Sequence, residues 1–353
     1  MIDRTGRDGA KPLLRVLAGE AVWPPPLWLM RQAGRYLAEY RAVRSGVADF
    51  IALCTTPDLA AEVTLQPIRR FGFDAAILFS DILMLPWALG HGLAFREGEG
   101  PVLPPLRDAA SLARLDPGRL AERIAPILET VRLVRAGLTR EGFDRTALIG
   151  FAGAPFTVAC YMVDGGSARD FVATRTMAYA DPGLFAALME KLTETTIAYL
   201  SAQIAAGAEV VMLFDSWAGL LAPPLFDAHV IGPARRIVAG LAALHPGVPV
   251  IGFPRLAGAA LGPYAAGSGV AAVGVDTGTA LGFARGAVGE KMALQGNLDP
   301  LAVLAGGAGL AAAVDAVLTA GRGGPFVFNL GHGILPATPV AHVEALVRQV
   351  RAG

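Results

Sequence analysis

The sequence predicts an α/β fold in which a single (β/α)8 TIM barrel spans residues 1–353, with its functional site at the carboxyl ends of the strands. Two observations lead to this prediction. Eight short apolar runs alternate with longer helical patterns, and most runs are continuously hydrophobic, as strands buried on both faces are. The chain has 353 residues, of which 54% are hydrophobic, and barrels of this size are routinely single domains.

The predicted strands are all short. They are expected at Leu27–Met30, Ala75–Phe79, Ala147–Phe151, Val210–Phe214, Val248–Gly252, Ala271–Val275, Met292–Gln295 and Phe326–Asn329. Eight strand–helix units in one chain favour a closed parallel barrel. The alternative is an open doubly wound sheet, but no GxGxxG motif follows a strand, so dinucleotide binding has no support.

Proline and aspartate mark the expected helix starts. One helix is expected to begin at Pro57, and another to begin at Asp181–Gly183 and to run to about Ala206. Pro223 and Pro339 indicate further starts, because proline is tolerated in the first turn of a helix. The proline-rich segments that we expect to be surface loops are Val22–Pro26 and Val102–Pro105.

Composition excludes several classes of protein. The formal net charge is zero, so the chain lacks the globally basic footprint of a nucleic-acid-binding protein. The two cysteines, Cys54 and Cys160, allow no disulfide framework and no CxxC metal knuckle. The longest apolar region, Ala75–Gly90, contains an aspartate and a proline and is too short to span a bilayer. With no apolar signal segment near the start, a cytoplasmic protein is expected, with residues 1–11 as a flexible arm.

The barrel prediction makes polar residues just after each strand candidates for the site. These residues are Arg31, Asp81, Asp215, Ser216, Asp276, Asn297 and His332. The alternative for an aspartate or asparagine there is an N-cap of the following helix. We expect Asp276 and Asn297 to be such caps and do not assign them to the site.

Paired arginines give the most informative stretch, Met30–Tyr36. Arg31 and Arg35 flank a small flexible pair, and an arginine fork binds a carboxylate through two bonds, so two forks suggest a ligand with several carboxylates. Taken alone, the pair could equally be surface arginines on a solvated turn. Asp81 has apolar neighbours on both sides, so its carboxylate needs a donor, a cation or a ligand unless it is solvated or caps a helix.

Two further residues are candidates with open alternatives. His332 lies between glycines, which would let the backbone approach a ligand closely, although it could be a satisfied loop histidine. Tyr161 follows a small-residue loop and could serve packing alone. A Schiff-base lysine, a zinc cluster and a Walker loop have no support, since Lys291 precedes its strand and neither cysteine has a nearby ligand. The remaining inventory could bind a polyanion whose interior becomes cationic, without metal or cofactor.

Six motifs, in order and with plausible spacing, resemble the uroporphyrinogen decarboxylase family over about residues 12–350. They are Met30–Tyr36, Phe79–Leu83, Gly153–Thr157 with Tyr161–Val163, Leu213–Ser216, Gln295–Pro300 and Asn329–Gly333. Two positions depart from the family pattern: Leu256 stands where glycine is usual, and Asp164 where glutamate is common.

The resemblance implies a homodimeric barrel enzyme that needs no cofactor. Its reaction converts the four acetate side chains of uroporphyrinogen to methyls and gives coproporphyrinogen. Asp81 would face the pyrrole N–H groups and stabilise the developing positive charge, while Arg31 and Arg35 would hold carboxylates. The other implied contacts are the backbone of Gln32, Ala33 and Gly34; the polar side chains of Tyr161, Ser216 and His332; and an apolar lining of Ile77, Phe151 and Phe214, for which core packing is an equal account.

The resemblance leaves the proton donor open between Arg31 and His332. Arginine is a poor general acid, and histidine is better matched near neutral pH. Two other functions are considered: a related methyltransferase on the same barrel, which would need a zinc held by His and Cys, and a non-catalytic tetrapyrrole-binding protein, which would need a lost catalytic residue. The chain lacks the zinc ligands, and none of the expected catalytic residues is missing.

Overall fold

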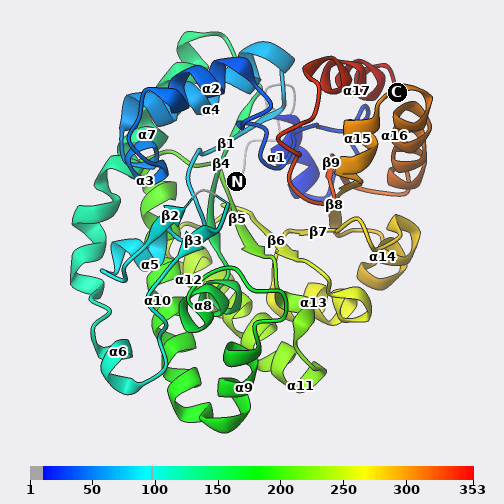
Figure 1. Cartoon of the computed structure of the whole chain (residues 1–353). Coiled ribbons are helices and arrows are strands. Elements are labelled where there is room, and N and C mark those ends of the chain that lie inside the picture. The colour runs from blue at the N-terminus through cyan, green and yellow to red at the C-terminus, as the bar shows by residue number, and fades with distance from the viewer. Residues whose placement is uncertain (1–10, 97) are drawn as a thin grey trace.

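Seven parallel strands form one curled sheet in the computed structural model of the chain, which describes residues 11–96 and 98–353. The order is β1-β4-β5-β6-β7-β8-β9, so the strands curl into a ring that is open between β9 and β1, and helices surround it (Figure 1). The strands are β1 Ala75–Ile77, β4 Ala147–Gly153, β5 Val210–Asp215, β6 Val250–Pro254, β7 Ala272–Gly274, β8 Ala293–Leu298 and β9 Phe326–Leu330. The α/β class and seven of the predicted strands are therefore confirmed, with ends shifted by a few residues.

The helices follow the strands in the alternating order that the sequence predicts. They are α1 Pro12–Leu17, α2 Ala38–Ser45, α3 Phe50–Cys54, α4 Pro57–Phe71, α5 Met84–Ala88, α6 Ala109–Ala113, α7 Leu120–Arg140, α8 Pro155–Asp164, α9 Val172–Ala180, α10 Pro182–Ala206, α11 Pro223–Phe226, α12 Gly232–Leu244, α13 Leu261–Ser268, α14 Leu281–Val288, α15 Pro300–Ala305, α16 Gly307–Gly321 and α17 Val340–Ala352. Short 3-10 or π turns are η1 Pro117–Arg119, η2 Ala218–Leu220, η3 Asp227–Ile231 and η4 Gly258–Ala260. None of the helices in residues 11–96 and 98–353 has the length and apolarity needed to cross a membrane.

The predicted helix starts are confirmed, and each has a local cause. Asp181 is the N-cap of α10 and accepts a hydrogen bond of 3.0 Å from the amide of Leu184, so a backbone donor that helix geometry leaves free is satisfied. Proline stands at the first position of α4, α10 and α11, and Pro339 immediately precedes α17.

The first predicted strand, Leu27–Met30, forms only a single parallel bridge, from Leu27 to Phe328 of β9. Side chains replace the ladder on either side of that bridge. The amide of Leu27 donates to Asp74 Oδ2 at 2.7 Å, and the amide of Met30 donates to Asn329 Oδ1 at 2.9 Å. The segment still lies between β9 and β1, because the amide of Asp74 donates to the carbonyl of Leu27 at 2.9 Å.

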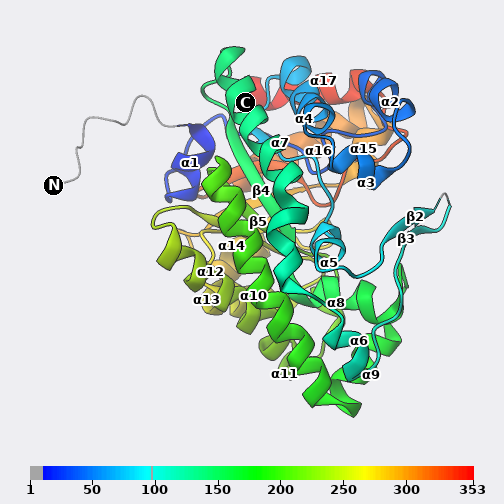
Figure 2. The ribbon, with the colours of Figure 1, turned by 90° about the vertical axis from the view of Figure 1, so that its left-hand side faces the viewer.

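A hairpin that the sequence did not predict precedes one of the predicted loops. Strands β2 Ala94–Arg96 and β3 Gly100–Val102 pair in an antiparallel manner outside the main sheet (Figure 2). The expected loop Val102–Pro105 therefore begins in a strand, and the amide of buried Leu103 donates to the carbonyl of Gly165 at 3.0 Å. Strands of three residues are too short to show an alternating pattern.

The start of the described chain is anchored. Lys11, the last residue of the predicted arm, donates to the carbonyl of Thr146 at 2.8 Å and to Glu209 at 2.6 Å. The other residues of the predicted arm, 1–10, lie outside the described part of the chain.

Side chains fill the centre of the ring. The indole N–H of Trp28 donates to Gln295 Oε1 at 2.9 Å, and the Gln295 amide lies 3.8 Å from the sulfur of Met212. All three side chains are buried. Because this interior is packed, a ligand must be bound at an end of the strands rather than through the middle.

Gln203 of α10 fixes the backbone of Phe151 in β4. Its Oε1 accepts from the amide of Phe151 at 2.8 Å, and its Nε2 donates to the carbonyl of the same residue at 3.0 Å. Gln203→Leu leaves both backbone groups unsatisfied, so we expect the free energy of unfolding to fall by about 2–4 kcal/mol. Urea unfolding tests this. Arg132→Gln, at an exposed ion pair of α7, is the control and is expected to change the value by less than about 0.5 kcal/mol.

Candidate active site

The predicted site residues come from loops at one end of the sheet. Arg31 follows the Leu27 bridge, Asp81 follows β1, Tyr161 lies on α8 after β4, Ser216 follows β5, and His332 follows β9. Figure 2 shows α5 and α8 toward the end of the molecule that carries the hairpin β2–β3, with α1 toward the other end. The carboxyl ends of these strands therefore form the mouth at which the candidates gather.

Asp81 is a half-buried carboxylate with one oxygen left unengaged. Its Oδ1 accepts from the amide of Leu83 at 2.8 Å, and no donor reaches its Oδ2 within the described residues. Burial raises the pKa of Asp81, while the Leu83 amide and the charge of Arg31 act in the opposite direction. The N-cap of α5 is Leu83 rather than Asp81, so the capping alternative does not describe this residue.

Arg31 has a left-handed backbone, with φ of 62°, and an exposed side chain. For a residue with a Cβ this conformation costs about 1–2 kcal/mol, so neighbouring contacts must hold it. The flanking Met30 is tied on both sides: its amide donates to Asn329, and its carbonyl accepts from the amide of Ile334 at 2.9 Å. The strained backbone of this segment is therefore at Arg31, whose charge acts on Asp81.

The other residues of the motif Met30–Tyr36 differ in their burial and in their hydrogen bonds. Gln32 is fully buried, and its amide donates to the carbonyl of Ala75 at 2.9 Å, so its side chain serves the fold. The backbone amides of Ala33 and Gly34 donate to no acceptor within the described residues, which leaves them available to an anion. Arg35 is exposed, and its charge opposes the burial that raises the pKa of Tyr40; of the two arginines, only Arg31 acts on the pKa of Asp81.

Trp217, which the sequence did not indicate as a site residue, follows Ser216 in the chain and lies near Tyr161. The ring centroids of Tyr161 and Trp217 are 6.4 Å apart. The amide of Trp217 donates to Thr157 Oγ1 at 3.1 Å, and that hydroxyl donates to Asp215 Oδ1 at 2.5 Å. Burial raises the pKa of Asp215 to about 7.

Buried Asp215 therefore holds the turn of Ser216 and Trp217 in place through the hydroxyl of Thr157. Burial also raises the pKa of Tyr161, while the Trp217 indole and the charge of Arg31 act in the opposite direction and the charge of Asp81 adds to the rise. Tyr161 therefore lies near both charged candidates.

The glycines beside His332 allow close contacts within the protein. A Cβ added at Gly331 would lie 2.3 Å from the amide nitrogen of Thr277, and one added at Gly333 would lie 2.4 Å from Cδ of Arg31. The Arg31 side chain therefore lies against the loop that carries His332. Burial, followed by the charges of Arg255 and Arg31, lowers the pKa of His332 from 6.5 to about 4.

The lowered pKa of His332 predicts how the stability of the protein depends on pH. A folded-state pKa below 6.5 means that the unfolded chain binds more protons between about pH 4 and 6.5, so His332 makes the protein less stable as the pH falls through that range. His332→Asn should weaken the dependence of the unfolding free energy on pH there. Urea unfolding at several pH values measures it, and an equally steep dependence in the variant would contradict the lowered pKa.

The three apolar candidates occupy the floor of the mouth. Phe151 and Phe214 pack edge to face, with ring centroids 5.5 Å apart and an angle of 88° between the ring planes. Ile77 and Phe151 are buried, whereas Phe214 is half-buried. In this structure all three pack against the core, and Phe214 retains the most exposure to a ligand.

Asp276 and Asn297, which we expected to be N-caps, do not cap a helix. The side chain of Asp276 accepts from the amides of Leu256, at 2.5 Å, and Gly278, at 2.9 Å. The side-chain amide of Asn297 donates to the carbonyls of Asp276 and Thr279, at 2.9 and 2.6 Å. Both side chains cross-link loops at the mouth, and Ala280 and Asp299 are the N-caps of α14 and α15.

A family profile described as uroporphyrinogen decarboxylase (URO-D) matches residues 8–353. A uroporphyrinogen decarboxylase of Granulibacter bethesdensis is 61% identical to this chain over 97% of it and 99% of its own length. One of Acidiphilium cryptum is 60% identical over 99% of this chain and 96% of its own length. The chain belongs to the uroporphyrinogen decarboxylase family.

A solved structure supports the fold. A methyltransferase from Methanosarcina mazei has a TM-score of 0.75 to this chain, with 22% identity and coverage of 97% of each chain. At this identity the likeness concerns the fold alone. No group of three or more His, Cys, Asp or Glu side chains that could hold a metal ion occurs in residues 11–96 and 98–353.

The two departures from the pattern of the uroporphyrinogen decarboxylase family have structural accounts. Leu256 has φ of 64°, a left-handed backbone that glycine adopts without strain, which explains why glycine is usual there. Asp164 accepts hydrogen bonds from the amide and the hydroxyl of Thr174, at 3.0 and 2.6 Å, and so holds the first turn of α9.

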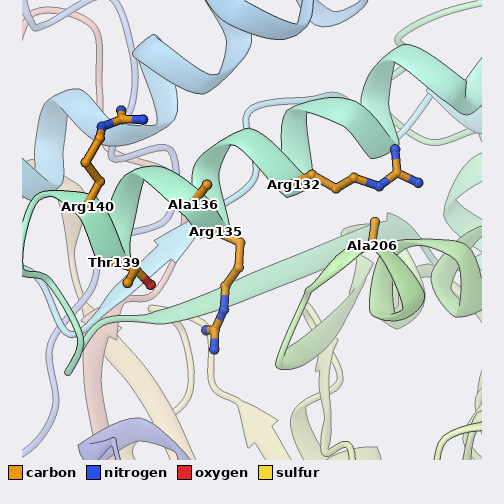
Figure 3. A pocket seen from close by; sticks show the side chains of 6 residues that line it. All are labelled: Arg132, Arg135, Ala136, Thr139, Arg140 and Ala206. Carbon is orange, nitrogen blue, oxygen red and sulfur yellow. The ribbon is translucent and has the colours of Figure 1, made fainter.

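A second basic feature lies away from the mouth. Figure 3 shows Arg132, Arg135, Ala136, Thr139 and Arg140 along α7, with Ala206 of α10 nearby; these residues line an open hollow of about 590 Å³. Its arginines have carboxylates within reach: Glu129 at 2.9 Å, Glu209 at 2.5 Å and Glu141 at 3.6 Å. Glu209 directly precedes β5, so the hollow is at the amino ends of the strands and its charge is already balanced.

Proposed function

We propose that this chain removes CO2 from the four acetate side chains of uroporphyrinogen and so gives coproporphyrinogen. Decarboxylation in tetrapyrrole biosynthesis is the function of its family, and curated relatives with 52–61% identity align over nearly its whole length. The observation that carries the proposal at the site is a half-buried Asp81 that keeps one oxygen free at the mouth and feels the charge of Arg31. That arrangement suits a polycarboxylate with a centre rich in N–H donors.

The chemistry needs an electron sink, which the substrate supplies. Protonation of a pyrrole ring beside its acetate makes that ring cationic. The bond between the acetate methylene and its carboxyl carbon then breaks, CO2 leaves, and the bonding electrons flow into the ring. A second proton adds to the methylene carbon and gives the methyl, while the ring loses the first. In sum, each acetate takes up one proton and releases one CO2.

Asp81 stabilises the cationic ring in this proposal. Its free Oδ2 accepts hydrogen bonds from the pyrrole N–H groups, and its negative charge faces the positive charge as it develops. Burial supports this role, because a charge that is already oriented and poorly hydrated requires little reorganisation during the reaction. The charge of Arg31 opposes the rise that burial causes in the pKa of Asp81, and its fork binds a carboxylate of the substrate.

The remaining candidates bind the rim of the substrate. Arg35 and the free amides of Ala33 and Gly34 take further carboxylates, and Gln32 holds their loop in place. Tyr161, Ser216 and His332 supply polar contacts, and the floor residues Ile77, Phe151 and Phe214 contact the macrocycle.

We retain Arg31 and His332 as joint candidates for the proton donor. A histidine with a pKa of about 4 is a neutral imidazole near pH 7, so in the free protein His332 lacks the imidazolium proton that a general acid gives up. Substrate carboxylates beside it would raise that pKa, whereas Arg31 is protonated throughout but is a weak acid.

The architecture of the working enzyme is part of the proposal. The Leu27 segment, between β9 and β1, acts as the eighth strand and completes one barrel domain over residues 1–353. The protein works as a homodimer in the cytoplasm, as the family resemblance implies.

An anaerobic assay tests the proposed function. Purified protein and uroporphyrinogen, with no added metal or cofactor, are expected to yield coproporphyrinogen through products that lose one carboxylate at a time. Chromatography of the oxidised products measures it. Folded protein that returns only unreacted substrate would overturn the proposal, and a metal analysis that shows tightly bound stoichiometric zinc would reopen the methyltransferase alternative.

A further inference from the structure

A third arginine, Arg255, stands at the mouth opposite Arg31. It follows β6, and three strands separate it from the Leu27 segment in each direction around the ring: β5, β4 and β1 on one side, β7, β8 and β9 on the other. Figure 1 shows β6 across the ring from the opening between β9 and β1, where Leu27 lies. We propose that Arg255 binds a substrate carboxylate on the side of the macrocycle that Arg31 and Arg35 do not reach.

The contacts of Arg255 leave its charge uncompensated. Its guanidinium carbon lies 5.9 Å from the ring centroid of Trp217, and its Nη1 is 3.5 Å from the carbonyl of Ser216, the outer limit of a hydrogen bond. No carboxylate comes within 4.0 Å of it in residues 11–96 and 98–353. A half-buried guanidinium without an anion is costly, and most of its donors remain free.

Hydrogen bonds from neighbouring turns hold the backbone of Arg255 and of the residue that follows it. The amide of Arg255 donates to the carbonyl of Asp215 at 3.0 Å, and the carbonyl of Arg255 accepts from the amide of Gly219 at 3.1 Å. The next residue, Leu256, is left-handed, and its amide donates to buried Asp276 at 2.5 Å. Asp276 and Leu256 are therefore positioning residues that fix the direction of Arg255.

Close packing reinforces this arrangement. A Cβ added at Gly219 would lie 1.9 Å from the carbonyl oxygen of Leu256, so the turn after β5 and the turn after β6 are in direct backbone contact. A strained residue kept in place by neighbouring loops is typical of a functional site. The charge of Arg255 also reaches His332, which Arg31 approaches through Gly333. The two arginines thus act on the same histidine from turns on opposite sides of the sheet.

A macrocycle with carboxylates around its whole rim fits such an arrangement. Arginines on one side alone would leave the far carboxylates desolvated and unpaired, whereas Arg255 supplies a fork where they would lie. Contact with the rim, remote from the reacting carbon, holds the substrate equally before and during the reaction. Loss of that contact should therefore raise KM more than it lowers kcat.

The inference rests on the proposed function, so binding and turnover are measured separately. Uroporphyrin, the stable oxidised form of the proposed substrate, is titrated by fluorescence against the full-length protein, Arg255→Gln, Arg255→Lys and the control Arg132→Gln. We expect Arg255→Gln to raise Kd about tenfold to a hundredfold, Arg255→Lys to raise it less, and the control to leave it unchanged. KM for uroporphyrinogen should rise similarly, with kcat within about threefold.

Each outcome decides one question. Wild-type protein that binds uroporphyrin but does not turn over uroporphyrinogen would overturn the proposed function, while the Kd ratio would still test Arg255. An unchanged Kd in Arg255→Gln, or an equal loss in Arg132→Gln, would overturn the role of Arg255. Should Arg255→Gln unfold, Arg255→Lys retains the charge and the contact with Trp217, and a wild-type Kd in that variant would overturn the need for the arginine fork.

Discussion

Asp81→Asn is expected to lower kcat for uroporphyrinogen by about a hundredfold to a thousandfold, the range seen when one preorganised electrostatic group is removed. Asparagine keeps the shape and the acceptor for the Leu83 amide, but it loses the negative charge that faces the cationic pyrrole. The same change should leave the protein as stable or more so. Burial raises the pKa of Asp81, which means that the fold disfavours its charged form at neutral pH.

The two effects are measured on the same preparation. Anaerobic turnover gives kcat, and urea unfolding gives the free energy of unfolding. Asp58→Asn, at an exposed aspartate in the first turn of α4, is the matched control and should alter kcat by less than about twofold. Near-normal turnover by Asp81→Asn, or a loss of activity that tracks a loss of stability, would refute charge stabilisation by Asp81.

Local patterns predicted most of the fold because local physics decides it. The boundaries of α10 follow from a capping aspartate and a proline at one end and Gly207 at the other. Continuous apolar runs such as Val210–Phe214 read as buried strands because both faces of a parallel sheet are covered. The run Leu27–Met30 gives the same signal, yet it makes only a bridge. The amides of Leu27 and Met30 donate to the side chains of Asp74 and Asn329, which are distant in sequence and which no local pattern reveals.

Site residues that directly follow a strand could be predicted from the sequence. Residues whose role depends on contacts with other loops were harder to predict. Arg31, Asp81 and His332 were found from their positions after apolar runs, and the structure brings all three to one mouth. Asp276 was assigned to a cap because its spacing before a helix fits one, but its strongest contact is with Leu256, a residue 20 positions earlier. The function of Arg255 was also not found.

The sequence carried one signal for Arg255: the next residue is Leu256, where the family usually has glycine. A left-handed position next to an arginine indicates a backbone held for a purpose. Trp217 gave no comparable signal, because an aromatic residue after a strand is more often part of the core.

Arg31→Gln is expected to lower kcat/KM by about a hundredfold or more, because a bidentate bond to a substrate carboxylate is lost and the field at Asp81 changes. The second effect gives a distinctive readout. Arg31 lowers the pKa of Asp81 against the larger effect of burial, so removal of the arginine must raise that pKa further. Since Asp81 has to be ionised in the proposed mechanism, the acid limb of the kcat profile should move to higher pH in Arg31→Gln.

Arg35→Gln supplies the matched control, because Arg35 belongs to the same motif but does not act on the pKa of Asp81. Loss of a rim contact alone should raise KM and leave the acid limb where it is in the wild type. A shift in Arg31→Gln without one in Arg35→Gln would assign to Arg31 a part in charge control as well as carboxylate binding. Equal profiles in the two variants would reduce Arg31 to a rim contact and leave His332 as the remaining candidate for delivery of the proton.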